Sequence, residues 1–87
     1  MRELQMGTRL IQTESRDWLR LDYSVLIGDQ ESGVEQYGLK IARQNGIEAI
    51  AVENITFSAQ RIFSLISLLM NHAVTPFGLE DVLDDWL

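Results

Sequence analysis

The dipeptide Asn45-Gly46 lies between two runs of alternating apolar and polar residues, and it constrains the fold of this 87-residue chain more than any other feature. Asn-Gly favours a two-residue type I′ turn, in which both central residues have positive φ. Counting outward from this turn gives two apolar pairs and one ion pair: Ile41 with Ile50, Leu39 with Val52, and Arg43 with Glu48. All three pairs fall on one face, so the sequence predicts an antiparallel hairpin in this register.

Residues 19–27 alternate in the same way and predict a preceding strand. The turn-forming segment 28–33 then joins this strand to the hairpin, with Tyr23 facing Tyr37 and Leu21 facing Leu39. Residues 4–13 are a candidate for a further strand near the terminus. Its expected pairs are Leu10 with Leu21, Met6 with Val25, and Arg9 with Asp22 on the outer face.

The C-terminal part of the chain has helical periodicity. Ser58 is a candidate N-cap for a helix that runs to about His72. Thr75-Pro76 interrupts the pattern, and Thr75 can cap a second helix with apolar residues Leu79, Val82, Leu83, Trp86 and Leu87. We therefore expect one α+β domain over residues 1–87. Its antiparallel β-meander of three to four strands is covered on one face by two C-terminal helices.

Four short blocks resemble a known family: Tyr37–Ile41, Val52–Thr56, Val74–Pro76 and Leu79–Asp85. By these blocks and the spacing between them, the chain resembles a small uncharacterised family from Gram-positive, clostridia-like bacteria, with similarity reaching back to about Trp18. The resemblance implies a small bacterial protein of unknown function, and it identifies no site residues.

Charge and cysteine content narrow the classes of function. Thirteen acidic residues against seven Lys and Arg give a net charge of −6, which disfavours binding to nucleic acid. There is no cysteine, and no stretch has the length of a membrane span or the apolar core of a signal peptide. We expect a cytoplasmic protein that binds neither nucleic acid nor membranes.

No constellation typical of catalysis is visible. His72 is the single histidine, and without a cysteine or a nucleophile motif it is better explained as a helix C-terminal residue. The acidic cluster Glu80, Asp81, Asp84 and Asp85 is typical of a solvated helix face, and the glycines match no phosphate-binding loop. The sequence predicts no enzyme activity, no cofactor and no metal site.

Candidate interface residues come from two places. The long helix carries no charge from Ile62 to Met70, and the side opposite its apolar arc holds small or amide residues: Gln60, Ser64, Ser67 and Asn71. Either the C-terminal helix or a second subunit could cover this side. Trp18 and Leu26 are expected on the outer face of the sheet beside small residues, and Trp86 completes the set.

The leading hypothesis is a non-catalytic protein–protein interaction or accessory module, with a homodimer as one form. The alternative is a small-ligand binding or sensing domain, with a pocket between the sheet and the helices. That pocket would be lined by Tyr23, Tyr37 and Phe63, with His72 nearby.

Overall fold

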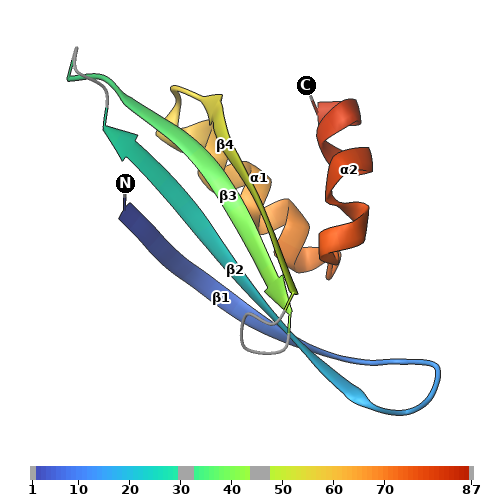
Figure 1. Cartoon of the computed structure of the whole chain (residues 1–87). Helices are drawn as coiled ribbons and strands as arrows, with labels where there is room; N and C mark the ends of the chain where they lie inside the picture. The colour runs from blue at the N-terminus through green and yellow to red at the C-terminus, as the bar shows by residue number, and fades with distance from the viewer. Residues whose placement is uncertain (1, 30–32, 44–47, 87) are drawn as a thin grey trace.

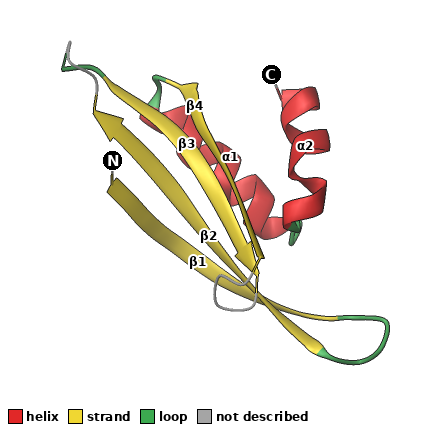
Figure 2. Cartoon of the chain, viewed as in Figure 1, coloured by secondary structure: helices red, strands yellow, loops and turns green. Residues whose placement is uncertain are grey.

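The computed structural model describes residues 2–29, 33–43 and 48–86. These residues form β1 (Arg2–Gln12), β2 (Trp18–Asp29), β3 (Glu35–Arg43), β4 (Glu48–Thr56), α1 (Ala59–Asn71), a 3-10 turn (Pro76–Gly78) and α2 (Leu79–Trp86). The strands make one antiparallel sheet in the order β1-β2-β3-β4, and the helices follow at the C-terminal end (Figure 1). The strands form one layer and α1 runs behind it (Figure 2). The predicted α+β fold is confirmed.

The core lies between the sheet and the helices. Its buried side chains are Leu19, Leu21, Tyr23, Val25, Leu39, Ile41, Ile62, Leu65, Ile66, Leu69, Leu79 and Leu83. The strand members alternate in sequence, and those of α1 recur at helical spacing, so each element buries the face that its periodicity predicts. Val52 of β4 is half-buried against the same core, so the expected common face of β2, β3 and β4 is confirmed.

The register of β3 with β4 is as predicted. Leu39 lies opposite Val52, Ile41 opposite Ile50 and Arg43 opposite Glu48, and the last pair forms an ion pair of 3.4 Å. The predicted Asn45-Gly46 turn lies outside the described residues.

The predicted register of β2 with β3 is wrong. Tyr23 lies opposite Ile41 rather than Tyr37, and Leu21 lies opposite Arg43 rather than Leu39. Strand β3 begins at Glu35, as predicted, but β2 continues beyond the predicted residue 27 to Asp29, which pairs with Glu35. The shift is an even number of residues, so the apolar side chains stay on the predicted face.

Residues 2–12 do form a strand, but its predicted pairing is also wrong. A β-bulge between Gln5 and Gly7 breaks the ladder, and Gln12 pairs with Trp18 across a longer loop in which Arg16 has φ 68°. Both irregularities change which residues face the core. Met6 does pack against the core, as expected, although it sits in the bulge.

The longer loop turns two other residues of β1 to the face opposite the predicted one. Leu10 lies opposite Arg20, not Leu21, and is exposed. Arg9 lies opposite Leu21 rather than Asp22, and its Nη1 donates a hydrogen bond of 2.9 Å to the Met70 carbonyl at the end of α1.

None of the helices in the described part of the chain is long and apolar enough to cross a bilayer.

Candidate interaction surface

The helix α1 is fixed at both ends and along one side. Ser58 is its N-cap, as predicted, and the Ser58 Oγ accepts a hydrogen bond of 3.2 Å from the Arg61 amide. His72 is the C-cap, and its amide donates to the Leu68 carbonyl at 3.1 Å. The side that meets the sheet is formed by Ile62, Leu65, Ile66 and Leu69. The opposite side therefore points away from the core.

We call that opposite side the α1 outer face, and define it by Gln60, Phe63, Ser64, Ser67, Leu68 and Asn71. These residues line a shallow, open hollow of about 570 Å³. The four residues that the sequence singled out, Gln60, Ser64, Ser67 and Asn71, are all exposed. Of the two alternatives, the one in which the C-terminal helix covers these residues is therefore wrong.

The position of α2 explains why it leaves this face open. Leu79 and Leu83 anchor α2 in the core, so the helix packs beside α1 and not over it. Trp86, a candidate interface residue, is half-buried and stacks on the Arg61 guanidinium at 4.4 Å from the ring centroid. This contact joins the two helices at one margin of α1. Trp86 is therefore engaged within the chain.

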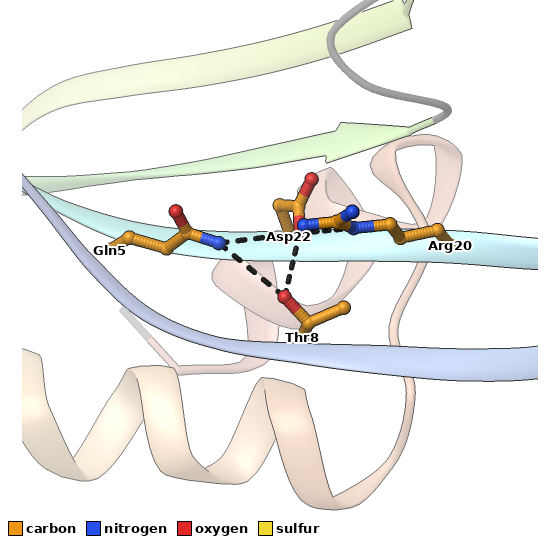
Figure 3. Close-up of polar contacts among 4 residues, drawn as sticks. All are labelled: Gln5, Thr8, Arg20 and Asp22. Atoms are coloured by element: carbon orange, nitrogen blue, oxygen red, sulfur yellow. Dashed lines mark hydrogen bonds and ion pairs between the residues drawn. The ribbon is translucent and has the colours of Figure 1, made fainter.

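The sheet face opposite the helices carries a polar cluster. The Asp22 carboxylate Oδ1 accepts hydrogen bonds from Thr8 Oγ1 at 2.7 Å, Arg20 Nε at 3.0 Å and Gln5 Nε2 at 3.3 Å. Figure 3 shows these side chains converging from the two neighbouring strands β1 and β2. These four side chains form hydrogen bonds with one another, so they need no external partner for those groups.

Leu26 is not available as a surface anchor. It lies on this outer sheet face, as predicted, yet only 5% of it is exposed. It lies opposite Glu3 on one side and Gly38 on the other, and the neighbouring residue Ser24 lies opposite Lys40. Because Lys40 Nζ reaches Glu3 at 3.2 Å, the ion pair crosses β2 beside Leu26 and shields it.

Trp18 lies elsewhere, near the end of the β1–β2 hairpin, and is 67% exposed. Leu10 is exposed on the same face of that hairpin, two pairs further along the ladder. The structure therefore separates the predicted candidates: Trp18 lies on the hairpin, Leu26 is buried, and the four residues of α1 lie together on its outer face.

The residues proposed for a ligand pocket do not line a common opening. Tyr23 is fully buried, and its hydroxyl donates a hydrogen bond of 2.8 Å to the Val74 carbonyl. His72 is exposed at the end of α1. The hollow that α1 lines lies on its outer side and not between sheet and helices. Among the described residues, no group of three or more His, Asp or Glu side chains is placed to hold a metal ion.

The sequence argument missed part of the surface. Phe63, which helical spacing places on the apolar side of α1, does pack partly buried against the core, and it also lines the hollow. Leu68, which helical spacing assigns to neither side, lines the hollow as well. At roughly 100° per residue they fall at the two margins of the outer face, where a period-based assignment is least decisive. Phe57 and Phe77, which precede and follow α1, are 62% and 76% exposed. Their only sequence signal is an aromatic residue in a connecting segment.

Fold and surface together define a small α+β domain, a four-stranded antiparallel meander with helices on one face and an uncovered helix side. A family model described as a family of unknown function (DUF6514) matches residues 2–87, and the chain belongs to this family. No curated protein and no solved structure matches the chain.

Proposed function

We propose that this protein is a non-catalytic protein-binding module, and that the α1 outer face is its docking surface. The observation that carries the proposal is a continuous exposed helix side without charged residues, from Gln60 to Asn71. Solvated helix faces ordinarily carry Lys, Glu or Arg, because water solvates charged side chains well and these residues favour the helix. A depletion of charge at the centre of an exposed surface is typical of protein interfaces.

The distribution of charge over the rest of the molecule supports this choice of surface. The exposed side of α2 carries Glu80, Asp81, Asp84 and Asp85. The outer sheet face carries the Asp22 cluster and the ion pair of Lys40 with Glu3. Against these charged surroundings, the α1 outer face offers two serines, two amides and the margins of Phe63 and Leu68. Amides, small hydroxyls and aromatic margins suit a packed contact with another protein.

We also propose that the protein is bacterial and works in the cytoplasm. The first point extends the resemblance of residues 37–87 to proteins of clostridia-like bacteria. The second rests on the composition, because a chain without cysteine forms no disulfide and does not need an oxidising compartment to fold.

Site-specific photo-crosslinking tests the docking surface. Ser64 is replaced by benzoylphenylalanine in the native host cells, and Ala49, which is exposed on the outer sheet face, is replaced in a control variant. The proposal predicts a discrete crosslinked protein from position 64 and none from position 49. Adding Ser67→Lys should abolish the product, whereas adding Ala51→Lys on β4 should leave it intact.

The identity of the product, read by mass spectrometry, then names the partner. Equal crosslinking from positions 64 and 49, or a product that survives Ser67→Lys, would contradict the assignment of the surface. Circular dichroism of each variant confirms that the helix is retained, since all four positions are exposed.

A further inference from the structure

The α1 outer face has the spacing of a helix–helix seam. Gln60, Ser64, Ser67 and Asn71 are separated by four, three and four residues, which is the a/d spacing of a coiled coil. These positions lie on the exposed side of a helix whose other side is fully buried. A surface of this shape fits another helix lying along it. Because serine is small, the two backbones can approach closely.

We propose that the occupant is α1 of a second copy of this chain, lying antiparallel across a two-fold axis. This inference rests on the proposed function and specifies its partner. With the axis centred between Leu65 and Ile66, Gln60 of one copy lies level with Asn71 of the other, and Ser64 lies level with Ser67. Amide groups then meet amide groups and hydroxyls meet hydroxyls, so each polar group finds a donor or an acceptor.

The margins of the seam are also complementary to themselves. A two-fold axis perpendicular to the helices keeps each margin on its own side, as an isologous interface requires. The two Phe63 side chains therefore meet along one margin and the two Leu68 side chains along the other. Within each pair, the two side chains lie five residues apart along the seam. That is about 7.5 Å along the helix axis, which aromatic and leucine side chains can span.

Charge favours the antiparallel direction. Arg61 is the single charged residue of α1, and no acidic residue occurs in its first turn. In a parallel pair the two positively polarised N-termini, each with its Arg61, would lie side by side. In an antiparallel pair Arg61 lies beside the C-terminal turn of the other copy, where a cation is stabilising, and the two helix dipoles are opposed. None of the residues that define the α1 outer face is acidic, so the seam itself contains no carboxylate.

The size of the surface sets the expected strength. A helix of 13 residues is only about 20 Å long, so α1 alone covers less than the roughly 800 Å² per partner of a standard interface. The antiparallel pair adds area at its two ends. There the N-terminal end of α1, which follows Phe57, approaches the C-terminal end of α1 in the other copy, which is followed by Phe77. Both phenylalanines are more than half exposed, and a phenylalanine can bury roughly 150–250 Å². We expect a dimer at the small end of stable interfaces, with a dissociation constant in the micromolar range.

Cysteine pairing tests the geometry directly, because the chain contains no cysteine. Gln60→Cys and Asn71→Cys are made separately, and each is oxidised mildly alone and in an equimolar mixture. The antiparallel pair predicts a disulfide-linked dimer in the mixture, formed at least about tenfold faster than with either variant alone. Two copies of residue 60 are 11 residues apart along the axis, about 16 Å, which is too far for the 4.4–6.8 Å between the Cα atoms of a disulfide.

Each outcome of the cysteine-pairing experiment supports or overturns the antiparallel dimer. Rapid linkage of Gln60→Cys alone would indicate a parallel pair and overturn the antiparallel arrangement. Linkage that is equally fast when Ala49→Cys replaces Gln60→Cys would indicate random collision, and also overturns it. If no mixture links while position 64 still photo-crosslinks to a different protein, the second copy is wrong and the docking surface stands. If neither experiment gives a product, both proposals fail.

Discussion

At the scale of single residues, Tyr23 connects the sheet to the segment that follows α1. Its ring is fully buried, and its hydroxyl donates to the Val74 carbonyl at 2.8 Å. Burial raises the pKa of Tyr23 to about 12, because the phenolate is poorly solvated in the core, and the nearby Arg9 lowers that pKa only in part. The alternation of residues 19–27 predicts a buried Tyr23, but the carbonyl that satisfies it lies 51 residues away.

Replacing this side chain gives a stability test with a defined pH window. At pH 7, Tyr23→Phe should lower the free energy of unfolding by about 0.5–1.5 kcal/mol, because the Val74 carbonyl loses its donor. Above pH 10 the unfolded tyrosine ionises while the folded one stays protonated. The stability that Tyr23 contributes is therefore complete below about pH 10 and falls as the pH rises towards 12.

Urea denaturation from pH 8 to pH 12 measures this effect. The wild type should lose about 2–3 kcal/mol more than Tyr23→Phe between pH 10 and pH 12, the linkage equivalent of two pKa units. All other ionisable groups are the same in both proteins, so their contributions cancel in the comparison. Parallel pH profiles for the two proteins would contradict a buried, neutral Tyr23.

At the scale of elements, the two bulges determine how the strands meet. In β4 the partner of Tyr37 is Thr56, whereas the partner of Leu39 is Val52, so extra residues of β4 lie opposite Gly38. One of them, Asn54, has φ 59°. The backbone of β4 consequently passes so close to Gly38 that an added Cβ would overlap the Val52 carbonyl oxygen and lie 2.8 Å from the Glu53 Cα.

This close approach predicts a large difference between two glycines. Gly38→Ala should lower the free energy of unfolding by about 1–3 kcal/mol, because the obstructing atoms belong to the backbone and cannot rotate away. Gly28→Ala is the matched control on β2, where the nearest atom is the Gln36 carbonyl oxygen at an ordinary 3.6 Å. It should change stability by less than about 0.5 kcal/mol or increase it slightly. Thermal denaturation of both variants measures this difference. Equal losses of stability in the two variants would show that the bulge in β4 does not require glycine at position 38.

The same elements show what sequence reasoning could and could not predict. Residues 39–52 have a turn dipeptide with a fixed loop length, so their register follows from counting. The register of β2 with β3 does not, because a slip of an even number of residues leaves every side chain on the same face. The longer loop before Trp18 places Leu10 opposite Arg20 on the outer face and exposes it, and the sequence does not reveal that loop length. The bulge between Gln5 and Gly7, further along β1, also leaves no period in the sequence.

The helices follow the same division. Ser58 acts as an N-cap as predicted, whereas Thr75 occupies the cap position of the 3-10 turn without a side-chain capping bond. The outer residues of α1 could be identified from their lack of charge. Whether α2 covers them depends on where Leu79 and Leu83 enter the core, and that is a property of tertiary packing which helical periodicity does not contain.

At the scale of the whole molecule, the charged and the uncharged parts of the surface are separated. The elongated domain, 49 × 25 × 16 Å, carries its paired polar groups on the outer sheet face and its carboxylates on α2. The uncharged α1 outer face lies on the side of α1 away from the sheet. Exposed Trp18 and Leu10 form a second uncharged area, here apolar, near the end of the β1–β2 hairpin and remote in sequence from α1. Of the two, only the α1 face is continuous over a whole element.

Sedimentation velocity of the wild type, Ser64→Lys and Ala49→Lys measures most directly whether the α1 outer face joins two copies. The two variants carry the same added charge, one in the seam and one on the outer sheet face. Between about 1 μM and 1 mM, the wild type and Ala49→Lys should rise from the 9.9 kDa of one chain towards twice that mass, while Ser64→Lys stays near 9.9 kDa. A wild type that remains at 9.9 kDa throughout, or a Ser64→Lys variant that dimerises as the wild type does, would contradict the account.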